Sequence, residues 1–271
     1  MPKTSVNGVE LDYRVDGPPE GDPVLLVCGT GQPAYSWRLG PMNRLVDAGY
    51  RVATFDNRGV SPSEAPPPPY SVLQMAEDAA GMIEHLGIGP CRVAGLSLGA
   101  FITQELALAR PDLVRAAVMM GTVGRQSPMM RYWAEGSLEA AREGVVLPRR
   151  LEAVMMVREV LSPAHQLDEG YVGPMLDLMV QVPPWTGPGR EGQLAADAAY
   201  EDRLTALAGV TVPALVIGFE HDLMTPASLG REVAESIPGG RYVEVPGCGH
   251  MGPFEDLDTT LGHLLAFFAE T

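Results

Sequence analysis

The sequence predicts an α/β fold: a three-layer α/β/α sandwich with a mostly parallel sheet and a helical insertion. Six short runs are interpreted as strands, and five of them are largely apolar rather than alternating, which is typical of strands buried on both faces of a parallel sheet. Helical patterns separate the runs, and this alternation implies right-handed crossovers. The runs are residues 24–28, 51–55, 93–94, 116–120, 214–217 and 242–245.

The elements before the insertion follow simple local patterns. Residues 6–13 predict a small hairpin with its turn at Asn7-Gly8. Residues 98–110 predict an apolar helix that Pro111 ends. Residues 71–86 predict another helix, in which one stripe of side chains is expected to be buried: Leu73, Met75, Ala76, Ala79, Met82, Ile83 and Leu86.

Residues 124–200 break the alternation because they contain no strand-like run. We interpret them as a helical insertion over the carboxyl edge of the sheet, where ligands bind in such folds. The core then consists of residues 1–123 and 201–271. The insertion is rich in large apolar side chains, which are typical of adaptable pocket walls. They are Met129, Met130, Trp133, Met155, Met156, Met175, Met179 and Trp185.

Composition narrows the classes of function. The 271 residues include 19 Lys and Arg against 34 Asp and Glu, a net charge of −15, which argues against nucleic-acid binding. The three cysteines are widely spaced, so a disulfide framework is not expected. They form no C-x-x-C, and no cluster of His, Cys and Asp has metal-ligand spacing, so we expect neither a metal nor another cofactor. No leader pattern and no run of 18 apolar residues occurs, so we expect a soluble cytoplasmic protein without membrane contact. A homo-oligomer stays open.

The strongest motif is Gly-Leu-Ser-Leu-Gly at residues 95–99, between a buried strand and an apolar helix. A serine on such a sharp turn needs small neighbours, which Gly95 and Gly99 provide. The turn lifts the Ser97 hydroxyl above the sheet edge, and the positive end of the following helix points at the same place. The context therefore predicts a nucleophile, whereas the alternative is a serine that only starts the helix.

A nucleophilic serine needs a base, and the chain has five histidines. His85 and His263 fall within helical patterns, and His165 lies in the insertion. His250 follows the last strand between glycines, so a loop can bring it to the sheet edge, and it is the predicted base. His221, after the preceding strand, is the rival.

The base needs a carboxylate to orient it. Asp222 and Glu220 both follow the strand at residues 214–217. We favour Asp222, with Glu220 as the fallback. For Asp222 the alternative is a helix N-cap, because a new helix is able to start near Thr225-Pro226.

The order Ser97, Asp222, His250 is the one that the α/β-hydrolase fold superfamily uses, and the sequence resembles that superfamily over nearly its whole length. It looks like the single-domain esterases and the cofactor-free, haloperoxidase-like perhydrolases of this superfamily. The resemblance implies an oxyanion hole formed by the N–H groups of Thr30 and Leu98, and it implies that residues 124–200 are the cap. The matching segments are the hairpin, residues 28–31, 56–59, 95–99, 218–222 and 249–250.

Two positions depart from the superfamily pattern. Cys28 stands where a histidine precedes glycine, and we interpret it as a small buried residue. Ser61 replaces the second glycine of R-G-x-G-x-S, so the loop beside the pocket is expected to be reshaped. Asp56 and Arg58 are interpreted as a structural turn that supports the oxyanion loop. Relatives with an aspartate nucleophile are disfavoured because the elbow carries Ser97.

The predicted activity is hydrolysis of a carboxylic ester or lactone of a medium-sized apolar substrate through an acyl-serine intermediate. The expected partner is therefore a small apolar ester, lactone or thioester. Thioester hydrolysis, C–C hydrolysis, perhydrolysis and acyl transfer use the same triad and stay open. A different class, a non-acylating cyclase or ligand-binding protein on the same fold, also stays open.

Overall fold

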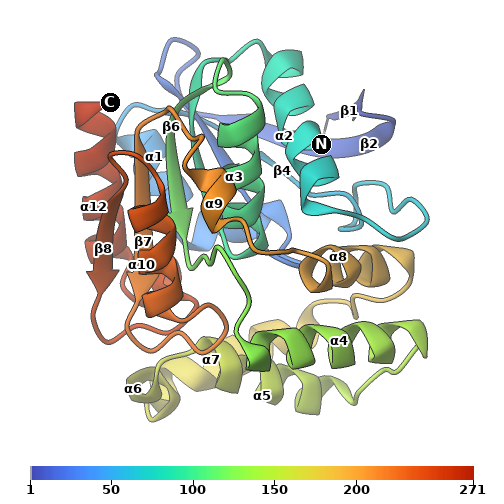
Figure 1. The fold of residues 1–271 in the computed structure, drawn as a ribbon. Coiled ribbons are helices and arrows are strands. Elements are labelled where there is room, and N and C mark those ends of the chain that lie inside the picture. The colour runs from blue at the N-terminus through green and yellow to red at the C-terminus, as the bar shows by residue number, and fades with distance from the viewer. Residues whose placement is uncertain (1) are drawn as a thin grey trace.

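The computed structural model describes residues 2–271, in which one eight-stranded sheet lies between helices (Figure 1). The strand order is β1-β2-β4-β3-β5-β6-β7-β8. The β1–β2 and β2–β4 pairs are antiparallel, and all others are parallel. The predicted fold class is therefore confirmed. The strands are β1 (Lys3–Val6), β2 (Val9–Asp16), β3 (Pro23–Val27), β4 (Arg51–Phe55), β5 (Cys91–Leu96), β6 (Val114–Met120), β7 (Ala214–Phe219) and β8 (Arg241–Val245).

The central strands are mostly apolar because helices cover both faces of the sheet. In β3, Leu25 and Val27 join a core shared with α2, α3 and α10. Val24 and Leu26 point the other way, into a core shared with α1 and α12. The helices of the two layers are η1 (Ala34–Leu39), α1 (Pro41–Asp47), α2 (Val72–Leu86), α3 (Leu98–Ala109), α9 (Leu204–Leu207), α10 (Ala227–Ser236), α11 (Gly252–Glu255) and α12 (Leu257–Glu270).

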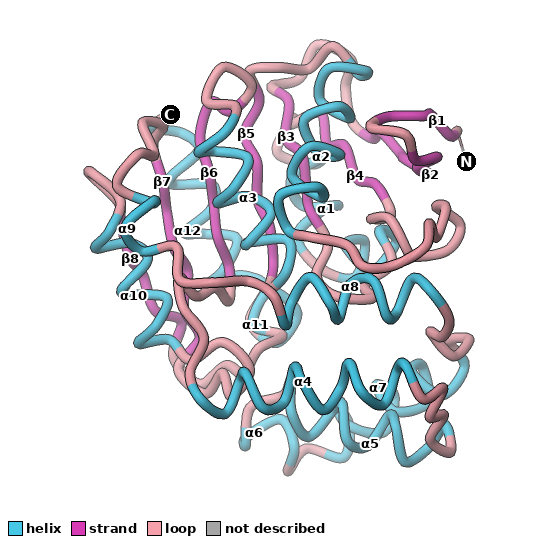
Figure 2. Tube along the Cα trace, turned by 45° about the vertical axis from the view of Figure 1, so that its right-hand side comes forward, coloured by secondary structure: helices cyan, strands magenta, loops and turns pink. Residues whose placement is uncertain are grey.

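The segment between β6 and β7 is helical, as predicted, and no strand occurs in residues 124–200. Figures 1 and 2 show α4 to α7 as a layer beyond the carboxyl ends of the parallel strands, with α8 between α4 and the sheet. This layer lies on the side of the sheet where active sites of α/β folds form. Its helices are α4 (Pro128–Arg142), α5 (Arg149–Val160), α6 (Pro163–Gln166), α7 (Glu169–Gln181) and α8 (Pro188–Ala198).

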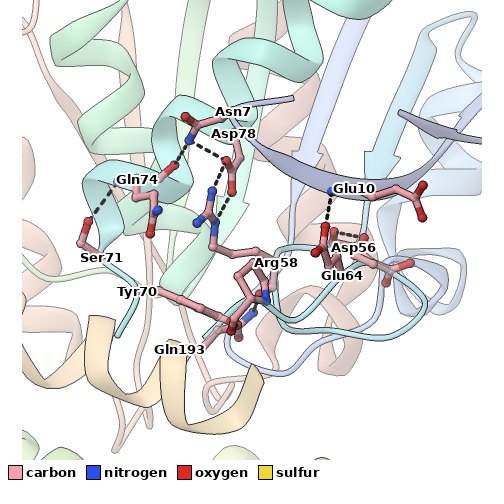
Figure 3. A network of polar contacts seen from close by, with 12 residues as sticks. Asn7, Glu10, Asp56, Arg58, Glu64, Tyr70, Ser71, Gln74, Asp78 and Gln193 are labelled. Atoms are coloured by element: carbon pink, nitrogen blue, oxygen red, sulfur yellow. Dashed lines mark hydrogen bonds and ion pairs between the residues drawn. The ribbon is translucent and has the colours of Figure 1, made fainter. Parts of the chain in front are cut away.

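One detail of the helix at residues 71–86 was predicted wrongly. Leu73 was placed on the buried stripe, yet it is 55% exposed. Asp78 is buried instead, because the guanidinium of Arg58 pairs with both of its carboxylate oxygens at 2.5 and 2.6 Å (Figure 3). Asn7 donates a further hydrogen bond to Asp78, at 2.9 Å. Periodicity places the polar residue on the solvent side because it does not reveal a partner from another loop.

The Arg58–Asp78 pair makes a stability prediction. Asp78→Ala leaves the buried Arg58 guanidinium without its counter-charge, and we expect a loss of about 3–5 kcal/mol in the free energy of unfolding. Urea denaturation followed by circular dichroism measures it. Asp112→Ala is the control, because its pair with Arg110 is exposed and should contribute little. Equal midpoints for both variants would contradict a structural role for the buried pair.

Candidate active site

Ser97 lies on a strained turn between β5 and α3. Its backbone φ is 57° and its ψ is −123°, values that L-residues rarely adopt. The flanking glycines make the turn possible: a Cβ on Gly95 would lie 2.0 Å from the carbonyl oxygen of Gly99, and a Cβ on Gly99 would lie 2.2 Å from that of Val27. The Ser97 N–H bonds to the carbonyl of Met120 at 3.0 Å, which ties the turn to the end of β6.

Two backbone N–H groups next to Ser97 have no hydrogen-bond acceptor within residues 2–271. Leu98 is the first residue of α3, so its N–H has no partner in the helix. In the loop after β3, the N–H groups of Gly29 and Gly31 donate hydrogen bonds to side chains, whereas the N–H of Thr30 has no hydrogen-bond acceptor among the described residues. A Cβ on Gly29 would lie 3.3 Å from the Cβ of Ser97. This loop and the start of α3 therefore lie beside the serine, as an anion site requires.

His250 and Asp222 are joined at the carboxyl edge of the sheet. Nδ1 of His250 lies 2.7 Å from Oδ2 of Asp222, and the side chains are 6% and 0% exposed. The carboxylate faces His250 with one oxygen, while its Oδ1 accepts hydrogen bonds from the N–H groups of Met224 and Thr225. Asp222 thus orders the turn before α10 and holds the imidazole at the same time.

Thr225 is a member of this cluster that the sequence reasoning did not identify. Its hydroxyl donates to Oδ2 of Asp222 at 2.7 Å and lies 3.2 Å from Nδ1 of His250. The hydroxyl therefore stabilises the charged carboxylate and restricts the rotation of the ring. A threonine three residues after an acid was the available signal, although it also fits a simple helix start.

The serine turn and the histidine–aspartate pair meet at the end of β6. Gly121 directly follows the carbonyl that binds Ser97, and its own φ is +53°. A Cβ on Gly121 would lie 3.3 Å from Cε1 of His250 and 3.3 Å from Oδ2 of Asp222. Glycine at this position keeps the two halves of the site in contact, and any side chain would crowd the imidazole.

The alternative acid and base lie elsewhere. Glu220 is about half exposed and accepts the N–H of Gly247, while His221 is 42% exposed and 3.9 Å from Glu220. His165, in α6, contacts the buried carboxylate of Glu255 at 2.8 Å. Glu220, His221 and His165 therefore lie outside the cluster around Asp222.

Within residues 2–271, no group of three or more His, Cys, Asp or Glu side chains is arranged to hold a metal ion. None of the described helices is both long and apolar enough to cross a membrane.

Cys28 and Asp56 make structural contacts beside the loop that carries Thr30. Cys28 is fully buried, which raises the pKa of its thiol, and its carbonyl accepts a hydrogen bond from Asn57. Asp56 accepts the N–H of Ala34 at 2.7 Å, and burial raises the pKa of its carboxyl to about 6. Together, Asn57 and Asp56 fasten the segment that follows β3.

An apolar cluster connects the insertion with the loops that carry the acid and the base. Met224 lies two residues after Asp222, and Met251 follows His250. Both pack against a buried cluster at the end of α5, and side chains of α7 pack against the same cluster. The remaining members of the cluster are Val157, Val160, Leu161, Tyr171, Val172, Met175, Leu176 and Met179.

Comparison with known proteins agrees with this geometry. Residues 22–257 match the family model for the alpha/beta hydrolase fold. A Mycobacterium tuberculosis protein named non-heme bromoperoxidase BpoC is 38% identical to this chain, over 96% of this chain and 98% of the relative. The chain matches the crystal structure of that protein with a TM-score of 0.91.

Two further relatives are named for hydrolysis. Rhodomycin D methylesterase DauP of a Streptomyces species is 29% identical over 88% of this chain and 87% of the relative. The enol-lactonase of Burkholderia xenovorans is 28% identical, with a TM-score of 0.85 over 99% of this chain and all of that chain. The chain therefore belongs to the α/β-hydrolase fold family, and within it to the non-heme haloperoxidase-like branch.

Proposed function

We propose that this protein is a serine hydrolase that cleaves a carboxylic ester or lactone of a medium-sized apolar substrate. One observation carries the proposal: a buried histidine–aspartate pair lies at the same strand end as a serine on a strained elbow. The backbone N–H groups of Thr30 and Leu98 support the proposal, because neither has a hydrogen-bond acceptor among the described residues. Two relatives are named for an ester and a lactone substrate, as a methylesterase and an enol-lactonase.

In the proposed mechanism His250 takes the proton of Ser97 as the hydroxyl oxygen attacks the carbonyl carbon. Asp222 keeps the proton of the neutral ring on Nδ1, so that Nε2 is free to act as the base, and it stabilises the imidazolium that forms. The N–H groups of Thr30 and Leu98 bind the oxyanion, and one such donor contributes about 3–4 kcal/mol to transition-state stability. His250 then protonates the leaving alcohol, and water attacks the acyl-serine.

Residues 124–200 are proposed to form the cap that covers the acyl site. Met175 and Met179 of α7 share the apolar cluster with Met224 and Met251, beside the acid and the base. Met155 of α5 lies outside this cluster and is 46% exposed. The acyl group is therefore expected to be apolar and to contact α7.

The cap makes a prediction about chain length. Burial of each added methylene contributes about 0.8 kcal/mol, so kcat/KM for p-nitrophenyl esters should rise several-fold per methylene until the pocket is full, and then fall. Met179→Ala should move the optimum to longer acyl chains, whereas Met155→Ala, the exposed control, should leave it unchanged. A flat profile from acetyl to decanoyl in all three proteins would mean that the cap does not line the acyl site.

The direct test of the activity combines a panel of esters, lactones and thioesters with a fluorophosphonate probe. We expect turnover of apolar esters and stoichiometric labelling at Ser97, identified by mass spectrometry of the labelled peptide. A wild-type protein that neither reacts with the probe nor hydrolyses any member of the panel would contradict the proposal and favour a ligand-binding protein.

A second candidate follows from the relative that is named a bromoperoxidase. If hydrogen peroxide replaces water as the nucleophile, its oxygen attacks the acyl carbon, the bond to the serine oxygen breaks, and a peracid leaves. The same residues serve this reaction. Peracid formation from an ester and hydrogen peroxide, measured against ester hydrolysis alone, separates the two activities.

A further inference from the structure

Trp185 and two side chains of α8 contact the loop that carries Thr30. The mechanism above assigns no role to these residues. The hydroxyl of Thr30 donates to Oδ2 of Asp197 at 2.8 Å. The N–H of Gly31 donates to Oε1 of Gln193 at 2.8 Å. The ring of Trp185 lies over Gly31, so closely that a Cβ there would be 2.7 Å from it. Three successive contacts therefore fasten a segment of two residues.

These contacts are themselves anchored in the core. Gln193 is fully buried, and its amide group donates to the carbonyl of Arg58 at 2.7 Å (Figure 3). The indole N–H of Trp185 donates to the carbonyl of Gly59 at 2.9 Å. The backbone carbonyl of Asp197 accepts the side-chain amide of Gln126, just before α4. Gln193 of α8 and Trp185 thus bond both the turn that follows β4 and the loop that carries Thr30.

We propose that Asp197 is a positioning residue of the oxyanion hole, an inference that rests on the proposed function. Its carboxyl orients Thr30 through the hydroxyl of that residue. When the carboxyl is ionised, its negative charge destabilises the oxyanion. It touches neither the substrate nor Ser97 in this scheme. An acceptor at Asp197 holds the side chain of Thr30, and this restrains the backbone N–H of the same residue toward the reacting carbonyl. A negative charge at Asp197 would raise the energy of a second negative charge nearby.

The surroundings of Asp197 make its charge sensitive to pH. Burial raises the pKa of the Asp197 carboxyl to about 7, and the hydrogen bond from Thr30 opposes this rise only in part. No cation pairs with Asp197 within residues 2–271. The charged groups on the neighbouring elements have other partners: Arg142 with Glu191, Arg125 with Glu232, Arg58 with Asp78, Arg203 with Glu105, and His250 with Asp222.

The pH profile of kcat/KM provides the test of positioning. In the wild type we expect kcat/KM to fall several-fold as Asp197 ionises around pH 7. Asp197→Asn keeps an oxygen acceptor for Thr30 but carries no charge, so the alkaline fall should disappear, with KM unchanged. Asp197→Leu removes the acceptor, and kcat should drop by about 10- to 100-fold at every pH. Glu191→Gln removes a charge from the same helix without touching the loop and should follow the wild type.

A second readout does not depend on turnover. The folded-state pKa of Asp197 lies above its ordinary value, so the native protein binds the proton more tightly than the unfolded chain, and wild-type stability is lost as pH rises from about 4 to 7. The Tm of Asp197→Asn minus the Tm of the wild type should therefore increase as pH rises from about 4 to 7. Above about pH 7 this difference should stay constant.

The outcomes separate the two proposals. If the wild type hydrolyses esters and its alkaline limb coincides with that of Asp197→Asn, the inference is overturned while the hydrolase function stands. If the wild type lacks both turnover and labelling at Ser97, the proposed function fails, and the oxyanion role of Asp197 fails with it. A Tm difference that stays constant from pH 4 to 7 would show that the Asp197 carboxyl does not titrate in this window, and it overturns the part of the inference that concerns its charge. If Asp197→Leu kept the kcat of the wild type, the positioning role would be overturned as well.

Discussion

Ser97→Ala is expected to lower kcat for any ester substrate by about 10⁶-fold, the loss that follows removal of a triad nucleophile. The hydroxyl of Ser97 makes no capping bond to α3, so its removal should leave the Tm nearly unchanged. Kinetics on an activated ester, with circular dichroism on the same preparation, measure both quantities. The fluorophosphonate probe should no longer label the protein.

The matched control is Ser71→Ala. Ser71 also precedes a helix, but its hydroxyl accepts the N–H of Gln74 and therefore caps α2. Its replacement should cost about 1 kcal/mol of stability and leave kcat unchanged. If Ser97→Ala kept near-wild-type turnover, Ser97 would be no more than a turn residue, and the nucleophile would have to be sought elsewhere.

Asp222→Asn is expected to lower kcat by about 10⁴-fold. An amide that donates toward His250 favours the wrong tautomer of the ring, so that Nε2 carries the proton and no longer acts as a base. Thr225 adds to the effect, because its hydroxyl now loses a charged acceptor. Stopped-flow measurement of acyl-enzyme formation, alongside steady-state turnover, shows whether the acylation step is the one affected.

Glu220→Gln is the control for Asp222→Asn. Both substitutions turn an acid of the loop after β7 into its amide, but Glu220 is about half exposed and bonds only to the N–H of Gly247. We expect kcat within a factor of about two of the wild type, because solvent-facing polar changes have small effects. The opposite ranking of the two variants would move the acid from Asp222 to Glu220.

Much of the fold was predictable because local rules agree with the global arrangement. The runs in β3 and β7 are apolar at each position, and β5 and β6 each contain one arginine. This pattern requires cover on both faces of the sheet. The glycines at 95 and 99 have one physical reason, since a Cβ at either would collide with backbone atoms. Leu73 shows the limit, because periodicity alone placed it inside, whereas a partner from another loop brought Asp78 there instead.

The site was predictable only in outline. The sequence places two acids and two histidines after the last two strands, and loop position does not distinguish between them. The structure brings Asp222 and His250 within 2.7 Å and leaves Glu220 and His221 at the surface. The assignment of Ser97, Asp222 and His250 as a triad stays a prediction that the kinetic variants test.

The sequence by itself determined the order of strands and helices, the serine elbow and the helical nature of residues 124–200. Each depends on interactions within about a dozen residues, such as steric room, periodicity and helix termination. Tertiary structure decided which side chains converge, because Asp197 meets Thr30 across 167 positions and His250 meets Asp222 across 28. Such contacts arise from strand order and helix packing, so periodicity and turn signals along the chain indicate candidates for them but do not select the partners.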